Sequence, residues 1–191
     1  MEDFHPVDAW NAIQKHRITT MMTVPAMLSF MLQTYPMVKP DVSSLRNISC
    51  GASVVPTSLI LGFRQLGVPI QQVYGVTEFT GGVSFWKETQ NKEKFTSMGK
   101  PVMQCGIRIV DIETKEPVST GTIGEIVLSG PQVFVGYYKN IESYNQTVRN
   151  GELFTGDVGY FDEDGFLYVV DRLKDMIISG GENIYTAVLE L

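Results

Sequence analysis

Residues Val170 to Asn183, with the sequence VDRLKDMIISGGEN, form the most informative stretch of the chain and lie close to its C-terminus. Arg172 carries a planar fork of hydrogen-bond donors that suits the oxygens of a ribose or a phosphate. Gly180 and Gly181 allow the backbone an unusual path beside a ligand. In isolation, however, Arg172 and Lys174 fit solvated charges that pair with the neighbouring aspartates. The meaning of this stretch therefore depends on the residues that precede it.

The composition is that of a folded globular protein with an acidic balance. Of 191 residues, 43% are hydrophobic and 19% are charged, enough for a sizeable core in one or two domains. The net charge of −6 provides no basic surface for nucleic acid. Cys50 and Cys105 form neither a disulfide framework nor a metal motif. Without an apolar run of membrane-spanning length or a signal peptide, the sequence predicts a cytoplasmic protein.

The first part of the chain, residues 1–93, alternates between helical and extended patterns. Such alternation predicts an α/β unit with a largely parallel sheet. The helices are predicted at residues 6–17, 25–33 and 56–66, and the strands at residues 18–24, 47–50 and 68–74. The last of these helices has inward-facing apolar side chains at Leu59, Ile60, Phe63 and Leu66. We expect four methionines to fill the core: Met21, Met22, Met27 and Met31.

The second part, residues 94–171, contains short β-rich runs separated by turn residues, which predicts a small barrel or sandwich. Its strands are predicted at residues 106–110, 124–128, 158–161 and 166–169, with one helix at residues 141–149. The run Asp162-Glu163-Asp164-Gly165 lacks calcium-loop spacing and is predicted to be a hairpin turn. Residues 172–191 form a third segment.

The motif Val73-Tyr74-Gly75-Val76-Thr77-Glu78 follows a predicted strand, where open α/β sheets place their ligands. Gly75 permits a tight turn, Tyr74 offers a flat face for a base, and Thr77 offers a hydroxyl for phosphate. Glu78 supplies a hard oxygen ligand for Mg²⁺. Taken alone, the motif also fits a turn at the end of a strand, with a buried tyrosine and an exposed glutamate.

Two further stretches have residue types that suit a nucleotide. The small residues of Ser49-Cys50-Gly51-Ala52-Ser53 would let a flat ligand approach the backbone, although simple close packing explains them as well. Asp157 in Thr155-Gly156-Asp157 can accept two hydrogen bonds from a vicinal diol, as a ribose requires. Its alternative role is to cap its own turn.

Together these motifs resemble, in their order and over nearly the whole chain, the adenylate-forming superfamily of acyl-CoA synthetases, luciferases and peptide-synthetase adenylation domains. Two supporting segments match the same family without a catalytic role, namely Gly124 to Pro131 with Gly136-Tyr137-Tyr138, and Met98 to Pro101. The resemblance implies the α/β and β-rich parts of the large N-terminal domain. Residues 172–191 would then contain the hinge and the start of a mobile C-terminal domain.

The resemblance also implies roles for individual residues. Tyr74 would contact adenine, Thr77 the α-phosphate, and Glu78 Mg²⁺, while Lys174 would be the pivot of the hinge. The catalytic residues would be Thr77, Glu78 and Lys174. The nucleotide would be bound by Gly51, Ala52, Tyr74, Gly75, Thr77, Asp157 and Arg172. The acyl pocket would be lined partly by Ala52, Val76, Phe79 and Gly82.

The implied reaction uses ATP and Mg²⁺ to convert a carboxylic acid, expected to be a fatty acid, into an acyl-adenylate, and then transfers the acyl group to CoA. The alternatives are a fragment of an aryl-acid or amino-acid adenylating enzyme, or a nucleotide-binding module without turnover. The family's phosphate loop and C-terminal lysine are absent from the sequence. Residues 186–191 also depart from its pattern, with Thr186 and Val188 where the family has Pro and Glu. We therefore expect an internal fragment with weak or no adenylation activity, whose exposed apolar face favours a homodimer.

Overall fold

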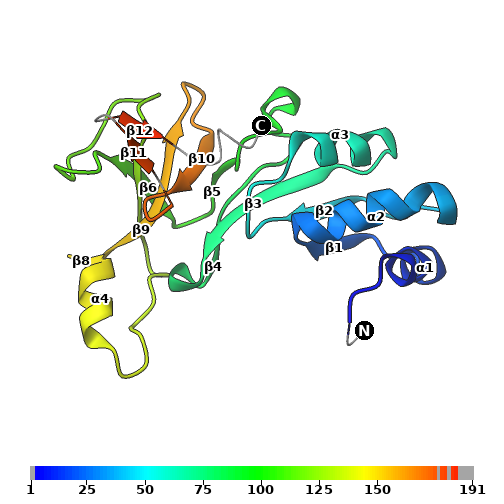
Figure 1. The fold of residues 1–191 in the computed structure, drawn as a ribbon, viewed down its shortest axis with the longest axis horizontal. Coiled ribbons are helices and arrows are strands. Elements are labelled where there is room, and N and C mark those ends of the chain that lie inside the picture. Colours follow the sequence, from blue (N-terminus) through cyan, green and yellow to red (C-terminus); the bar gives the residue numbers. More distant parts are fainter. Residues whose placement is uncertain (1–2, 176, 180–181, 185–191) are drawn as a thin grey trace. The chain divides into compact units, whose positions relative to one another are not determined.

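The computed structural model describes residues 3–175, 177–179 and 182–184 (Figure 1). The chain divides into two compact units. One contains the residues up to Val73 together with Trp86–Thr96, and the other contains Tyr74–Phe85 together with the residues from Ser97 onward. The boundaries at residues 93 and 171 stay a prediction from the sequence.

The first unit has parallel strands with helices between them, which confirms the predicted α/β class. Strands β1 and β3 both pair with β2 in parallel. The strands are β1 (Thr20–Thr23), β2 (Asn47–Cys50) and β3 (Ile70–Val76), and the helices are α1 (Pro6–His16), α2 (Pro25–Val38) and α3 (Thr57–Gln65). Only Ile70–Val73 of β3 belongs to this unit, because the strand continues into the second one.

Helices α1 and α2 begin at Pro6 and Pro25, where the missing N–H and fixed φ of proline are tolerated. Helix α2 is longer than predicted, because it continues through Pro36 to Val38. The N–H of Lys39, in the left-handed conformation with a φ of 46°, donates to the carbonyl of Tyr35 and closes the last turn. Tyr35 and Val38 also pack against the core, so tertiary contacts offset the cost of the internal proline.

The core of the first unit is centred on Trp10. Its ring is fully buried and stacks on Phe63 at a centroid distance of 6.1 Å, while its Nε1–H donates to the carbonyl of Met31 at 2.9 Å. The predicted inward face of α3 is confirmed, since Ile60 and Phe63 are buried. The prediction for Met22 is wrong: its side chain is 75% exposed. It alternates along β1 with the buried Thr23, and successive side chains of a strand point to opposite faces.

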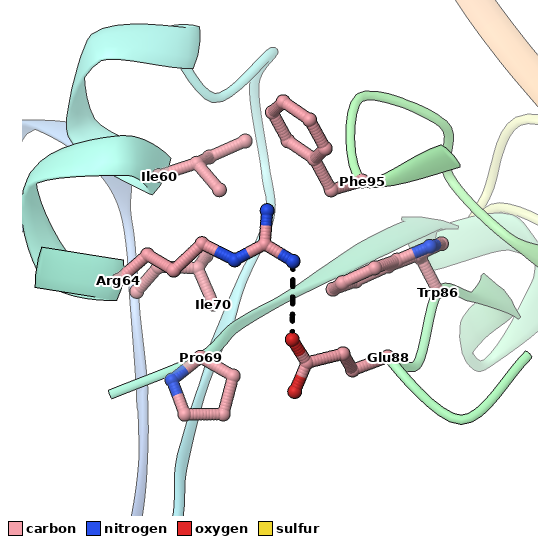
Figure 2. Close-up of a pocket in the computed structure, with 7 residues that line it drawn as sticks. All are labelled: Ile60, Arg64, Pro69, Ile70, Trp86, Glu88 and Phe95. Carbon is pink, nitrogen blue, oxygen red and sulfur yellow. Dashed lines mark hydrogen bonds and ion pairs between the residues drawn. The ribbon is translucent and has the colours of Figure 1, made fainter. Parts of the chain in front are cut away.

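A small pocket lies in the first unit between α3, the start of β3 and the segment that follows Phe85 (Figure 2). The guanidinium of Arg64 lies 5.4 Å from the ring centre of Phe95, and its Nη2 is 3.1 Å from Glu88 Oε1. The pocket is lined by Ile60, Arg64, Pro69, Ile70, Trp86, Glu88 and Phe95. None of these residues belongs to the motifs from which a nucleotide site is predicted.

The second unit is built mainly from antiparallel strands, which confirms its predicted β-rich character. Its larger sheet has the order β10-β9-β7-β6, with β8 paired to β9. These strands are β6 (Gly106–Val110), β7 (Gly124–Ser129), β8 (Val148–Arg149), β9 (Glu152–Phe161) and β10 (Leu167–Arg172). The short strands β4 (Gly81–Phe85) and β5 (Lys100–Pro101) pair with each other, as do β11 (Ile177–Ser179) and β12 (Glu182–Ile184). Helix α4 spans Ile141–Thr147, and short 3₁₀ helices span Thr77–Phe79 (η1) and Lys92–Lys94 (η2).

The predicted hairpin turn at Asp162 to Gly165 joins β9 and β10. Asp162 Oδ1 accepts hydrogen bonds from the N–H groups of Asp164 and Phe166, at 3.0 and 2.9 Å. Gly165 has a φ of 76°, in the left-handed region that favours glycine. The turn sets the pairing of Phe161 with Leu167, and an irregularity between Val169 and Asp171 of β10 then places Arg172 opposite Asp157 of β9.

Candidate nucleotide site

The Thr-Gly-Asp motif forms a bulge in strand β9. Between the pairs Glu125–Val158 and Val127–Phe154, β9 advances by four residues while β7 advances by two. The additional residues therefore belong to the segment 155–157, which contains the motif. Such bulges redirect side chains and occur often beside active sites.

Side chains and backbone groups within the second unit hold this bulge in place. The hydroxyl of Thr155 donates to the carbonyl of Ile126 at 2.7 Å and accepts from the N–H of Asp157 at 3.0 Å. Gly156 has a φ of 69°, and its carbonyl accepts from the N–H of Leu173 at 2.8 Å. The motif therefore has a defined backbone geometry that its own hydrogen bonds maintain.

Asp157 lies between two donors from different strands. The hydroxyl of Tyr74, at the end of β3, donates to Asp157 Oδ2 at 2.7 Å. Arg172 of β10 places Nε 3.0 Å from Asp157 Oδ1. The structure thus brings together three residues that the sequence assigned to nucleotide binding. Asp157 is only 4% exposed and Tyr74 only 8%, so a diol can reach the carboxylate only if one of its neighbours moves.

Burial is the main cause of the shifted pKa values of Asp157 and Tyr74. It raises the pKa of Asp157 above its ordinary value, while the hydrogen bond from Tyr74 and the charge of Arg172 offset part of the rise. Burial also raises the pKa of Tyr74, and the negative charge of Asp157 raises it further. Tyr74 therefore remains a hydrogen-bond donor throughout the range in which proteins are studied.

Glu78 belongs to η1, which begins directly after β3. Its Oε1 accepts a hydrogen bond from the hydroxyl of Tyr137 at 2.8 Å, and its backbone carbonyl accepts from the N–H of Phe134 at 2.8 Å. Among the described residues, nothing hydrogen-bonds to its Oε2, so this oxygen retains the capacity to bind a cation. From the sequence, Tyr137 belongs only to a supporting segment of the family resemblance. Its contact with Glu78 is visible only in the folded structure.

The glycines of the motifs have a packing role of their own. A Cβ added at Gly51 would lie 2.5 Å from the carbonyl oxygen of Val73, in the same unit. One added at Gly75 would overlap the carbonyl oxygen of Gly81. Gly75 is not among the residues with positive φ, so the close approach of Gly81, and not a left-handed turn, requires glycine there. Ala52 is exposed with a φ of 72°, an uncommon conformation for alanine.

The residues predicted to line an acyl pocket lie in different surroundings. Phe79 is buried in the hydrophobic core of the second unit, and Val76 packs against that core. A Cβ at Gly82 would lie 2.7 Å from the ring of Phe85. Ala52 belongs to the first unit. Lys174, the predicted pivot, is exposed and directly follows Leu173, whose N–H is bound to the bulge.

Neither a metal-binding cluster nor a membrane-spanning helix occurs in the described part of the chain. Within residues 3–175, 177–179 and 182–184, no three His, Cys, Asp or Glu side chains are grouped so that they could hold a metal ion. No helix in the same residues is long and apolar enough to cross a bilayer.

A family model described as AMP-binding enzyme matches residues 1–138, which is more than half of the chain. The chain therefore belongs to the family of AMP-binding enzymes, the superfamily that its motifs resemble. The match begins in the first unit and includes Tyr74, Thr77 and Glu78.

The chain is similar in sequence to longer ligases. It is 40% identical over 187 residues to feruloyl-CoA synthase of Amycolatopsis sp, which covers 98% of this chain and 38% of that protein. It is 40% identical over 184 residues to 2-succinylbenzoate–CoA ligase of Bacillus cereus (strain ATCC 10987 / NRS 248), which covers 94% of this chain and 37% of that protein. The chain thus spans less than two fifths of the length of these relatives.

Solved structures of the family share the fold. O-succinylbenzoate coenzyme A synthetase (MenE) from Bacillus subtilis, in complex with ATP and magnesium ion, matches with a TM-score of 0.85 and 35% identity over 97% of this chain and 38% of that chain. Amide bond synthetase McbA from Marinactinospora thermotolerans matches with a TM-score of 0.89 and 30% identity over 99% of this chain and 39% of that chain. The predicted fold class, α/β followed by a β-rich part of the family's large N-terminal domain, is confirmed.

Proposed function

We propose that this chain carries the adenosine-binding part of an ATP-dependent, AMP-forming acid–CoA ligase. The observation that carries the proposal is the position of Asp157 on a bulge between Tyr74 and Arg172. A carboxylate with this support is an acceptor for the two hydroxyls of a ribose. The likeness to a relative solved with ATP and magnesium ion supports the same assignment.

The proposed roles of the individual residues are those that the family resemblance implies, and they suit the chemistry of the side chains. Tyr74 and Asp157 would bind the base and the ribose, with Arg172 beside them and the backbone at Gly75 along the nucleotide. The assignment of Gly51 and Ala52 to the nucleotide stays a prediction from the sequence. Thr77 would bind phosphate and Glu78 would hold Mg²⁺, since no described residue hydrogen-bonds to Oε2 of Glu78. When bound, Mg²⁺ would neutralise phosphate charge during attack by the acid. Lys174 would serve as the pivot of a hinge, because its side chain is exposed.

The acid is proposed to be aromatic. The sequence favoured a fatty acid, with an aryl acid as the alternative. Relatives named for feruloyl, 2-succinylbenzoate and indoleacetate groups, at 38% to 40% identity, favour an aryl acid. CoA would be the acceptor of the acyl group, as in the reactions for which these relatives are named. Amino-acid activation and nucleotide binding without turnover are the remaining alternatives.

The test is a calorimetric titration of the 191-residue chain with AMP. The wild-type chain is expected to bind, and Asp157→Ala is expected to bind at least about tenfold more weakly, because the diol loses its acceptor. Glu163→Ala, in the exposed hairpin turn, removes one negative charge elsewhere in the same unit and serves as the matched control. Unchanged affinity in Asp157→Ala would refute the proposal.

The class of acid is tested with two stable acyl-adenylate analogues, one with an aryl group and one with a long aliphatic chain. Tighter binding of the aryl analogue is expected.

Pyrophosphate exchange by the isolated chain is expected to be weak or absent. Side chains such as Val135, 98% exposed, and Met103, 86% exposed, provide apolar surface for the proposed homodimer, which light scattering would detect. A cytoplasmic location stays a prediction.

A further inference from the structure

Glu125 is a buried carboxylate with no role in the proposed reaction, yet it contacts the Thr-Gly-Asp bulge directly. It lies on β7 and is only 4% exposed. Its Oε1 accepts a hydrogen bond from the N–H of Gly156 at 3.1 Å, and its Oε2 lies 2.8 Å from Lys115 Nζ. A buried charge persists only where it has such partners.

The contact with Gly156 replaces a missing ladder bond. A bulge leaves backbone groups of the longer strand without partners on the neighbouring strand. The N–H of Gly156, in the middle of the bulge, would be one of these groups. The side chain of Glu125 reaches it from β7, next to the carbonyl of Ile126, which binds Thr155. Two contacts thus attach the bulge to β7. One is made by the side chain of Thr155, and the other by the N–H of Gly156.

Lys115 is itself held in place by a tight turn between β6 and β7. Its N–H donates to the carbonyl of Asp111 at 3.0 Å, and Asp111 Oδ1 accepts from the N–H groups of Glu113 and Thr114. Lys115 adopts a φ of 62°, and its side chain is about one-third exposed, at 32%. The turn therefore places the ammonium group of Lys115 beside Glu125, and Lys115 is not itself part of the bulge.

We infer that Glu125 is a positioning residue, which fixes the N–H of Gly156 and thereby orients the Asp157 carboxylate toward the ribose diol, with Lys115 as its counter-ion. The inference rests on the proposed nucleotide site. Glu125 does not contact the ligand in this scheme. It determines the conformation of the peptide that precedes Asp157, and thus the direction of the Asp157 side chain.

The experiment compares two ligands, AMP and 2′,3′-dideoxy-AMP, which lacks the diol. Glu125→Ala is expected to weaken AMP binding about tenfold and to leave the affinity for the dideoxy analogue unchanged. Glu125→Gln retains an oxygen acceptor for Gly156 and is expected to bind AMP within about twofold of the wild-type chain. Glu163→Gln is the matched control. The effect of Glu125→Ala should vanish in an Asp157→Ala background, because the two residues act through one contact.

A second measurement does not depend on the ligand. Amide hydrogen exchange at Gly156, followed by NMR, should be slow in the wild-type chain and in Glu125→Gln, and fast in Glu125→Ala. Equal loss of both ligands in Glu125→Ala, or unchanged AMP affinity, would overturn the inference and leave the proposed function intact. If the wild-type chain does not bind AMP, the proposed function fails, and equal exchange at Gly156 in all variants would then overturn the positioning role as well.

Discussion

Arg172 of β10 lies directly opposite Asp157 of β9 in the antiparallel register, and its Nε is 3.0 Å from Asp157 Oδ1. The carboxylate is buried, whereas 55% of the Arg172 side chain is exposed. The arginine therefore covers the acid from the solvent side. Under the proposed function, this pair would connect the stretch that contains Arg172 to the carboxylate proposed to bind the ribose.

Removal of this arginine should weaken nucleotide binding. Arg172→Met keeps much of the side-chain volume but loses the charge and the donors beside Asp157. Because the side chain is largely exposed, the expected loss of AMP affinity is moderate, between about threefold and tenfold. Arg172→Lys should recover only part of it, since an ammonium lacks the planar fork. Calorimetry checks both variants, with the exposed Arg46→Met as control; an effect of similar size in the control would contradict the assignment.

Loss of the Tyr74 hydroxyl should destabilise the folded chain. Tyr74→Phe keeps the buried ring but leaves Asp157 Oδ2 without its donor. A buried acceptor without a partner costs about 1–3 kcal/mol, so the free energy of unfolding in urea should fall by this amount. Tyr138→Phe, at an 88% exposed position, should leave the stability unchanged. Equal stability of Tyr74→Phe and the wild-type chain would contradict this prediction.

The raised pKa of Asp157 predicts how binding depends on pH. Since the pKa of the folded state lies above the ordinary value of 3.8, the carboxylate takes up its proton at a higher pH than in the unfolded chain. The affinity for adenosine, which has the diol but no phosphate, should therefore begin to fall at a pH above 3.8. Asp157→Asn should remove this dependence. A fall that begins only below the ordinary value would contradict it.

The raised pKa of Asp157 affects stability in the opposite direction to ligand affinity: low pH weakens binding but favours folding. A carboxyl whose pKa is raised in the folded state favours folding when it is protonated. The contribution of Asp157 to the free energy of unfolding is therefore fully present at pH values below 3.8 and is lost as the pH rises through its folded-state pKa. The difference in stability between the wild-type chain and Asp157→Asn, measured in urea across this range, should change accordingly.

The two cysteines should react slowly with thiol reagents. Burial raises the pKa of both Cys50 and Cys105 to about 11. At pH 8 only about one thiol in a thousand would then be ionised, and the thiolate is the reactive form. Cys50 is fully buried and Cys105 half-buried, so in the native chain Cys105 should react before Cys50. Colorimetric titration with and without denaturant measures this; rapid modification of native Cys50 would contradict it.

Elements with strong local patterns were predictable from the sequence. Pro6 and Pro25 mark the starts of α1 and α2, and Asp162 to Gly165 has the composition of a turn. Strand β9 was predicted to begin at Val158, whereas it begins at Glu152, because its first half contains the bulge and does not alternate simply. Pairing with β7 and β8, and not local preference, keeps that half extended.

The contacts of the candidate site depend on strands far apart in the chain. Tyr74 and Asp157 are 83 residues apart in sequence, so their hydrogen bond follows only from the packing of the second unit. A resemblance between motifs could propose that both residues meet one nucleotide, but not that they contact each other. The sequence placed Glu125 in a supporting segment and gave it no role. Its contact with Gly156 could not be predicted, because it depends on the register between β7 and β9.

The bulge in β9 also restricts insertions and deletions near Asp157, whether or not a ligand binds there. Leu153 and Val158 lie on either side of the motif, and both are buried, with 1% and 0% exposure. Loss of one residue between them would shift one half of the strand by a single position and turn one of these side chains toward water. The spacing of the Thr-Gly-Asp motif is therefore maintained by folding as well as by chemistry. Related chains can be expected to tolerate substitutions here far better than insertions or deletions.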